Sequence, residues 1–492
     1  MIALAGGLFV AVAGQALAAV PGAAPPPTTA TPGTPVPTAL LRFFQYQRPA
    51  TYGSLRLQVQ VPVRDGVDLG CYLYEPETEG TAHEATGTFP GIIDNFTPYY
   101  LADPAGAYSG VSFAEHGYLD LECTPRGTGT SGGAFPGWFS AQEARDNYDL
   151  IEWLAHRPDS TGKVGQEGNS YGGITAYRVA ALHPPALVTI APQQSYASLY
   201  LDFDYPGGIR SLGDPYWDVA AAFLGGGRNL ASTQEAMWVQ HPLLDSYWQQ
   251  IDISGKWSQI HLPVLGFGGW ADIFQNGMVL DYLALAGPNT YLIDGPWTHG
   301  NTFDATVTGG ALLAWFDHWL RGDAAAPLPP THVASYQMPA GPWQALPAWP
   351  PAGGREVLAL TTAGGLGPAG SGAGPAGSGA GPAGARSYTA SPGGGAADLP
   401  SGDHLIFTGA PLAQAEQIGG AAVIRLVATL SGASGGRADT NFVLHLSDVA
   451  PGGATTLITR GYLKASHYRS QSHPATLPLG QAIAFTIPLW QV

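Results

Sequence analysis

The sequence predicts an α/β fold with a mainly parallel sheet, followed by an all-β sandwich. Three observations indicate this. Strand-like and helix-like segments alternate between about residues 55 and 335, which is typical of a parallel sheet with helices on both faces. One strand–helix junction carries a Gly-x-Ser-x-Gly motif around Ser170. Beyond about residue 335 the helix-like segments end, and short alternating strands favour a β-sandwich of jelly-roll type.

The first elements lead towards the Ser170 motif. Residues 56–63 and 67–74 are expected to form a hairpin, and residues 89–94 and 118–123 the next two strands. Residues 143–157 carry apolar side chains at helical spacing. After the motif, strands are expected at residues 186–191, 263–267 and 290–293, a helix at 312–320, and sandwich strands at 405–407, 422–430, 440–446, 455–465 and 482–489.

The motif itself has the form of a nucleophile elbow. A short strand meets Gly168-Asn169-Ser170-Tyr171-Gly172, and a helix-like segment follows. This order places a serine at the tip of a sharp turn, as in an α/β-hydrolase. Side chains at the two flanking glycine positions would collide with the closely packed helix. The sequence therefore predicts an α/β-hydrolase with Ser170 as its nucleophile.

Two further Gly-x-Ser motifs, around Ser131 and Ser434, compete with this assignment. Glycine accounts for 68 of the 492 residues, so such short motifs also arise by chance. No helix follows Ser131, and Ser434 lies in a Gly/Ser/Ala turn. Only Ser170 has both flanking elements; the alternative there is an inert serine in a Gly-rich turn.

A nucleophilic serine needs a base and an orienting carboxylate, which in this fold follow the serine in the order acid, then histidine. Asp272 and His299 each lie just past a predicted strand, in that order. Asp294 is the competing acid, but it lies at the end of its strand, and His318 is the competing base, but it lies inside a helix. The predicted triad is Ser170, His299 and Asp272, and no metal ligand or cofactor is expected.

The reaction also needs donors to the developing oxyanion. The backbone N–H of Tyr171 is one candidate. The hydroxyl of Tyr99, after the strand at residues 89–94, is the other; the alternative is that Tyr99 forms an aromatic wall. Trp270, Phe274 and Trp297 flank the predicted acid and base and are candidates for the substrate pocket.

Together these motifs resemble the cocaine esterase / X-Pro dipeptidyl peptidase family, the CocE/NonD hydrolases of the S15 group. The similarity spans roughly residues 55–490. Its motifs include Asp65-Gly66-Val67, Pro98-Tyr99, Arg126-Gly127, the Ser170 elbow, Tyr205-Pro206-Gly207-Gly208, Gly269-Trp270, Gly295-Pro296-Trp297, Trp315-Phe316-Asp317-His318 and Asp439-Thr440-Asn441-Phe442. The resemblance implies a helical cap, a C-terminal jelly roll, the triad above, and Tyr99 with the Tyr171 N–H as the oxyanion hole.

Several departures from the family pattern bear on the substrate. The family usually has an aspartate before its Arg-Gly motif, where this chain has Thr124-Pro125. In related α-amino acid ester hydrolases, acidic residues follow the catalytic aspartate and bind the substrate amine; here residues 273–275 are uncharged. The large N-terminal domain of lactococcal-type X-Pro peptidases is absent, and the jelly roll is expected to be truncated at Val492.

The expected domains follow from composition. They are a signal peptide at 1–18, a Pro/Thr-rich linker at 19–45, an α/β-hydrolase domain at 46–335 with a helical cap at about 195–260, and a jelly roll at 336–492 with a low-complexity loop at 363–386. An apolar stretch and Ala16-Leu17-Ala18 indicate export, although no basic residue follows Met1. The protein is therefore expected to be secreted or periplasmic; the alternative is an apolar N-terminal tail.

The two cysteines, Cys71 and Cys123, lie in strands that the hydrolase fold places side by side. In an exported chain this favours a disulfide; the alternative is two buried thiols.

Composition excludes other functions. The formal net charge is −16 and no basic stretch occurs, which argues against nucleic-acid binding. No segment is expected to span a membrane, and the oligomeric state is left open. The sequence therefore predicts an exported serine hydrolase that cleaves a small ester, amide or short peptide through an acyl-enzyme. The alternatives are an X-Pro dipeptidyl peptidase and a non-catalytic secreted binding protein.

Overall fold

The computed structural model contains two compact units. The first, here the α/β unit, comprises Pro27–Phe203 and Leu212–Trp349; the second, the β unit, comprises Met1–Pro26, Asp204–Ser211 and Pro350–Val492. The structure describes residues 2–5, 36–78, 80–99, 110–211, 240–300, 306–339, 341–361, 363–368, 386–388, 404–432 and 439–492. Within these residues, no helix is both long and apolar enough to cross a bilayer.

The α/β unit is built on an eleven-stranded sheet. Its central strands run parallel, in the order β6 (Leu119–Cys123), β5 (Phe89–Asp94), β7 (Ser160–Asn169), β8 (Leu187–Gln193), β9 (Val264–Ala271), β10 (Thr290–Thr298) and β11 (Val333–Tyr336). Antiparallel strands flank them: β12 (Trp343–Leu346) at one edge, and β3 (Asp68–Thr78), β2 (Gly53–Pro62) and β4 (His83–Glu84) at the other. The predicted mainly parallel sheet is confirmed.

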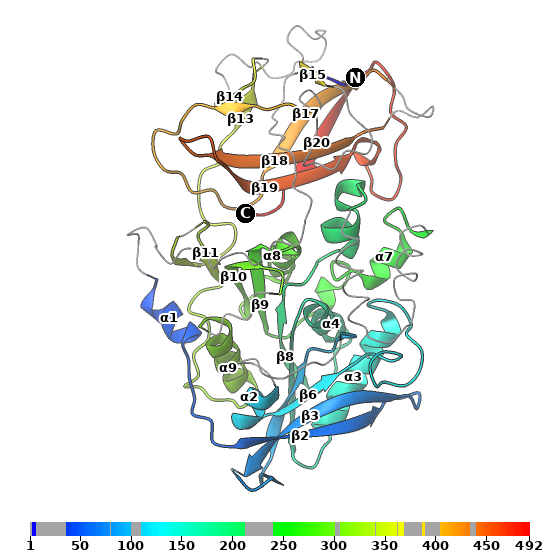
Figure 1. Ribbon diagram of the computed structural model, residues 1–492, viewed down its shortest axis with the longest axis vertical. Helices are drawn as coiled ribbons and strands as arrows, with labels where there is room; N and C mark the ends of the chain where they lie inside the picture. The colour runs from blue at the N-terminus through cyan, green and yellow to red at the C-terminus, as the bar shows by residue number, and fades with distance from the viewer. Residues whose placement is uncertain are drawn as a thin grey trace. The chain divides into compact units, whose positions relative to one another are not determined.

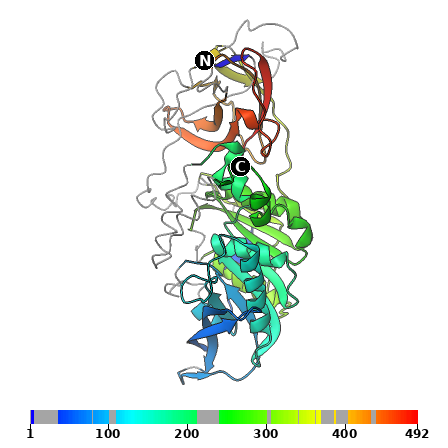
Figure 2. The same ribbon diagram turned by 90° about the vertical axis from the view of Figure 1, so that its right-hand side faces the viewer.

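Helices cover both faces of this sheet, with α1, α2 and α9 on one side of the strands and α3 and α4 on the other (Figure 1 and, turned by 90°, Figure 2). Successive residues of β5 face opposite sides: Ile92 belongs to the core that contains α9, whereas a side chain at Gly91 would meet Leu154 of α3. The helices are α1 (Thr38–Phe44), α2 (Gly110–Glu115), α3 (Ala141–Ala155), α4 (Tyr171–Ala180), α8 (Gln275–Leu285) and α9 (Thr308–Trp319).

Two elements differ from expectation for packing reasons. Helix α1 lies within the predicted linker, because Leu40, Phe43 and Phe44 bury one apolar face in the core of the α/β unit. Helix α9 begins at Thr308 rather than 312. A side chain at Gly310 would lie 2.0 Å from the carbonyl oxygen of Phe44, so glycine permits the close approach of the chain after α1.

The predicted cap at 195–260 is described only in part, because residues 212–239 lie outside the described residues. Its described portions contain short elements. They are a π-helical turn at Tyr200–Asp204, a 3-10 turn at Pro206–Gly208, α7 (Ser246–Ile251) and a 3-10 turn at Trp257–Gln259.

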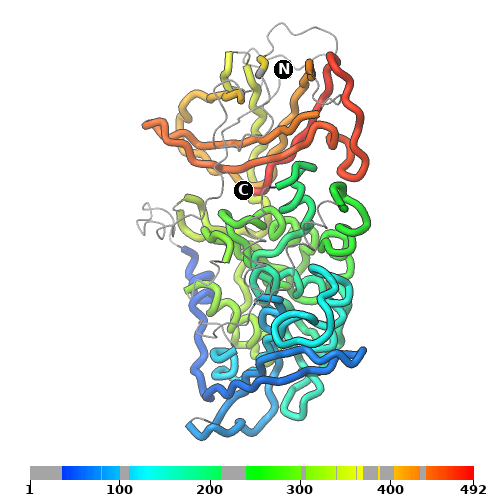
Figure 3. Tube along the Cα trace, turned by 45° about the vertical axis from the view of Figure 1, so that its right-hand side comes forward, coloured from blue at the N-terminus to red at the C-terminus, as the bar shows by residue number. Residues whose placement is uncertain are grey.

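The β unit contains the predicted sandwich strands. Strand β17 (Val423–Leu430) pairs with β20 (Ala482–Pro488), and β18 (Asn441–Val449) pairs with β19 (Thr455–Lys464). The orange tubes of Figure 3 show β18 and β19 side by side. One apolar core contains Leu426 of β17, Phe442 of β18 and Phe485 of β20, so both strand pairs contribute to it. The predicted C-terminal β domain is confirmed.

Smaller strands of the β unit modify the predicted boundaries. Residues 405–407 form no strand; Leu405 and Phe407 are buried in the core and β16 is Thr408–Gly409. Strand β14 (Gly365–Pro368) pairs with β13 (Leu358–Leu360) at the start of the predicted low-complexity loop, whose residues 369–385 lie outside the described residues. Strand β1 (Ile2–Ala5), inside the predicted signal peptide, pairs with β15 (Arg386–Tyr388) and β17.

A disulfide joins the two cysteines. Cys71 on β3 and Cys123 on β6 are register partners, with an S–S distance of 2.00 Å. It ties the antiparallel edge of the sheet to its parallel centre.

Candidate active site

Ser170 lies at the junction between β7 and α4, and its backbone is strained. Its φ is 55° and its ψ is −112°, a conformation that side-chain-bearing residues rarely adopt. A side chain at Gly168 would lie 2.8 Å from the Gly172 Cα, and one at Gly172 would lie 2.7 Å from Asn95 Oδ1. The two glycines thus allow the tight turn that presents Ser170.

A continuous hydrogen-bonded relay runs from this serine. His299 Nε2 lies 2.9 Å from Ser170 Oγ, and His299 Nδ1 lies 2.6 Å from Asp272 Oδ1. The Asp272 side chain is fully buried, and its Oδ2 accepts the N–H of Phe274 at 3.0 Å. Both carboxylate oxygens are therefore paired, which fixes the carboxylate towards the imidazole.

Gln194, which the sequence did not single out, holds the histidine loop. Its Nε2 donates to the carbonyl of Thr298 at 2.8 Å. Its Oε1 accepts the N–H of Gly300 at 2.7 Å and the side-chain amide of Asn169 at 2.9 Å. Gln194 thus connects the residue before Ser170 with the loop that carries His299. The sequence hint to this role is that Gln194 is a polar residue just past the strand predicted after the Ser170 motif.

Within the described part of the chain, the competing residues form no hydrogen bond to the relay. Asp294 is buried on β10, and burial together with the charge of Asp272 raises its pKa well above the usual range. The Nδ1 of His318 lies 3.2 Å from the carbonyl of Ala326. Ser131 Oγ donates to the carbonyl of Thr124 in a surface loop, and Ser434 lies outside the described residues.

The two residues that carry the candidate oxyanion donors are in ring contact. The rings of Tyr99 and Tyr171 meet edge to face, with centroids 5.7 Å apart. Tyr171 is the first residue of α4, so its N–H has no partner within the helix. Burial raises the pKa of the Tyr99 hydroxyl. A neutral hydroxyl in this state can donate.

Behind the elbow, the Tyr171 hydroxyl donates to the buried carboxyl group of Glu143 at 2.7 Å. Burial raises the pKa of Glu143 to about 8, although the Tyr171 hydrogen bond and the charge of Arg178 partly oppose this. The ring of Phe139 packs on Tyr171 with centroids 4.3 Å apart. Glu143 therefore helps to fix the residue that carries the candidate oxyanion N–H.

The three predicted pocket residues have different surroundings. The Phe274 ring meets the His299 imidazole edge to face at 5.3 Å. Trp270 is half-buried and packs on Trp349. Trp297 is buried in the core that contains α9 and packs on Trp343. Of the three, only Phe274 has a described ring contact with the relay.

The Arg-Gly motif serves a structural ion-pair network. Arg126 donates to both carboxylate oxygens of Asp146 at 2.6 Å and to Asp65 at 2.8 Å. Asp146 is fully buried. Asp146 and Asp65 thus supply the acidic partners of Arg126, whereas Thr124 and Pro125 occupy the position of the family's usual aspartate.

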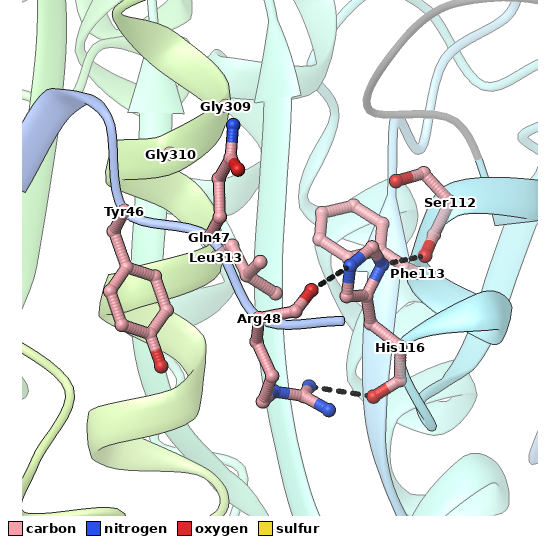
Figure 4. A pocket seen from close by; sticks show the side chains of 9 residues that line it. All are labelled: Tyr46, Gln47, Arg48, Ser112, Phe113, His116, Gly309, Gly310 and Leu313. Atoms are coloured by element: carbon pink, nitrogen blue, oxygen red, sulfur yellow. Dashed lines mark hydrogen bonds between the residues drawn. The ribbon is translucent and has the colours of Figure 1, made fainter. Parts of the chain in front are cut away.

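A pocket of the α/β unit lies away from the relay. Tyr46, Gln47, Arg48, Ser112, Phe113, His116, Gly309, Gly310 and Leu313 line it. Both ring nitrogens of His116 lie within hydrogen-bond distance of carbonyl oxygens, one of Ser112 and one of Arg48, and Arg48 donates to the His116 carbonyl (Figure 4). These contacts tie the segment after α1 to α2.

The fold and the relay define a serine hydrolase of the α/β-hydrolase class. The model of the X-Pro dipeptidyl-peptidase S15 family matches residues 65–301, and the model of the X-Pro dipeptidyl-peptidase C-terminal non-catalytic domain matches residues 325–492. The chain thus contains the S15 domain followed by the C-terminal domain of the X-Pro dipeptidyl-peptidases, and it is similar to the CocE/NonD hydrolases.

Individual relatives agree with this assignment. Cocaine esterase from Rhodococcus is 24% identical over 512 residues, covering 89% of this chain and 87% of that protein. A solved α-amino acid ester hydrolase superposes with a TM-score of 0.70 at 21% identity, covering 91% and 88% of the two chains. A CocE/NonD hydrolase from Staphylococcus aureus gives 0.66 at 18% identity, covering 94% and 88%. The protein is an enzyme, which sets aside the non-catalytic alternative.

Proposed function

We propose that the protein is a carboxylesterase or acylase whose catalytic triad is Ser170, His299 and Asp272. The observation that carries the proposal is the relay, in which distances of 2.9 Å and 2.6 Å connect the three side chains. His299 takes the proton from Ser170 as the hydroxyl attacks the carbonyl carbon, and then returns it to the leaving group. Asp272 holds the imidazole in the required tautomer and stabilises the imidazolium.

The tetrahedral intermediate forms at the start of α4. The N–H of Tyr171 and the hydroxyl of Tyr99 donate to its oxyanion, and the first turn of the helix adds a favourable dipole. Collapse of this intermediate leaves an acyl group on Ser170. Water, deprotonated by His299, then releases the acid and regenerates the serine.

An X-Pro dipeptidyl peptidase is the second candidate, favoured by the match to the S15 family model. That reaction requires an anchor for the free amine of the substrate. Ile273, Phe274 and Gln275 follow Asp272 and carry no charge, which supports an ester substrate over a free-amine peptide.

The test compares two substrates on the same preparation. We expect turnover of a p-nitrophenyl ester, little turnover of a Gly-Pro anilide, and loss of ester turnover in Ser170→Ala. Efficient anilide turnover that requires a free N-terminal amine would establish the peptidase instead. Ester turnover that survives Ser170→Ala would contradict the mechanism.

Export is a further part of the proposal. The cleavage motif Ala16-Leu17-Ala18 and the Cys71–Cys123 disulfide support it. The mass of the protein recovered from culture medium or periplasm should correspond to a chain that begins at Ala19; recovery of uncleaved protein from the cytoplasm would contradict it.

A further inference from the structure

Three buried acidic side chains and one half-buried one gather in the sheet of the α/β unit, and we call Asp94, Asp120, Glu122 and Glu167 the carboxylate cluster. The register pairs Asp94 of β5 with Glu122 of β6 and with Glu167 of β7. Asp120 lies two residues before Glu122 on the same face of β6. Oxygen atoms of Asp94, Asp120 and Glu122 all lie within 4.8 Å of one another.

Asp120 has no protein partner to offset its burial. Its side chain is 0% exposed, and neither carboxylate oxygen has a hydrogen-bond partner among the described residues. An unpaired carboxylate in such surroundings is very costly unless positive charge or donors compensate it. One Asp120 oxygen lies within 4.8 Å of oxygens of Asp94 and Glu122.

Gln193, a hydrogen-bond donor to Glu167, has an unpaired side-chain oxygen among the described residues. Gln193 is 2% exposed, and its Nε2 donates to Glu167 at 2.6 Å, but its Oε1 has no partner in the described part of the chain. An amide oxygen of this kind is a ligand that hard cations accept. It is not acidic, so repulsion among the carboxylates does not account for it.

Within the described part of the chain, little positive charge acts on the cluster. Arg56 acts on Glu122 electrostatically, and its guanidinium lies 5.0 Å from the centre of the Tyr72 ring. One arginine cannot balance four carboxylates. The Arg126 network differs, because its guanidinium pairs directly with both of its acids.

We propose that the carboxylate cluster binds one divalent cation through oxygen ligands, with calcium the preferred ion. Calcium accepts carboxylate and amide oxygens at about 2.3–2.6 Å in a flexible geometry, so three carboxylate oxygens within 4.8 Å of one another can share one calcium ion. Magnesium needs shorter distances of about 2.0–2.1 Å. Asp94, Asp120 and Glu122 supply the ligands, and Glu167 and Gln193 border the site.

The cation stabilises the elbow. Asn95 donates to Asp94 Oδ1 at 2.6 Å, and its own Oδ1 accepts the N–H of Asn169 at 3.0 Å. Asn169 directly precedes Ser170. Glu167 lies on β7, the strand that contains Asn169, three residues before Ser170. Cation binding therefore stabilises the ends of β5 and β7, on which the elbow is built.

The test uses the full chain after treatment with EDTA and removal of the chelator. We expect terbium to bind at one equivalent, with luminescence sensitised by Tyr74, the register partner of Asp120, and calcium to displace it. Calcium should also raise the Tm by a few degrees, and magnesium by less.

Variants identify the ligands. Asp120→Asn should abolish terbium luminescence and the calcium-dependent rise in Tm, whereas Asp68→Asn, which alters an exposed acid on β3, should preserve both. If Asp120→Asn fails to fold, Glu122→Gln, which changes a half-buried residue, replaces it as the test variant.

Two results would overturn the proposal. The first is an unchanged Tm with no saturable terbium binding in the native chain; protons would then neutralise the cluster. The second is equal binding in Asp120→Asn, Glu122→Gln and Asp68→Asn, which would indicate general attraction of cations to a chain of net charge −16.

Discussion

The relay and the carboxylate cluster lie at the carboxyl ends of strands of the same sheet, yet their polar atoms are satisfied differently. In the relay, both oxygens of Asp272 and both nitrogens of His299 have partners. In the cluster, Asp120 has none among the described residues. The relay is therefore complete with protein groups alone, whereas we propose that a bound cation completes the cluster. A buried polar group left unpaired calls for such an explanation.

The relay is tested most severely by Ser170→Ala. We expect kcat/KM for a p-nitrophenyl ester to fall by at least about 10⁴-fold, because no nucleophile remains to form the acyl-enzyme. Ser131→Ala, in the competing motif, is the matched control and should keep its turnover per folded molecule. Equal losses in both variants would indicate damage to the fold.

The cost of an unpaired buried acid can be measured at the Arg126 network. Arg126→Ala leaves Asp146 buried without its bidentate partner and should lower the free energy of unfolding by about 3–5 kcal/mol. Urea denaturation measures this. The double variant Arg126→Met/Asp146→Leu should recover much of the loss, because it removes the stranded charge; no recovery would show that the charge is not responsible.

Gln194→Ala tests how the histidine loop is positioned. Loss of its bonds to Thr298 and Gly300 should lower kcat about 10- to 100-fold through misplacement of His299, with a smaller change in KM. The exposed Gln249 on α7 gives the control variant Gln249→Ala. An unchanged kcat would mean that the loop holds its position without Gln194.

A smaller effect, on the pH dependence of stability, is expected from Glu143. Burial is the main reason why its pKa is about 8 and not the usual 4.5. A raised folded-state pKa favours the protonated form, so its stabilising contribution is complete below pH 4.5 and is lost as the pH rises towards 8. The free energy of unfolding should fall over this range by at most about 1.4 kcal/mol per pH unit. Glu143→Gln should flatten the curve, whereas the exposed control Glu416→Gln should not.

Sequence reasoning succeeded where local pattern and chain order carry the information. The Gly-x-Ser-x-Gly turn, and an acid and a histidine each following a strand, marked Ser170, Asp272 and His299, which the structure brings into one relay. Chain order and strand spacing likewise predicted the parallel sheet, because helices alternate with most of its strands.

Sequence reasoning failed where contacts join elements that are far apart in the chain. The oxygens of the carboxylate cluster come from three strands whose adjacency follows only from the sheet order, so no ligand spacing appears in the sequence. Gln194 acts through backbone groups of a loop more than one hundred residues away. Trp297 was expected in the pocket because it lies two residues before His299, but its side chain is buried in the core that contains α9.

Labelling with a fluorophosphonate, followed by peptide mapping by mass spectrometry, tests the central claim most directly. The relay predicts one adduct, on the peptide that contains Ser170, with its rate of formation greatly reduced in His299→Ala. An adduct on another serine, or no adduct on folded protein, would contradict the assignment of Ser170 as the nucleophile.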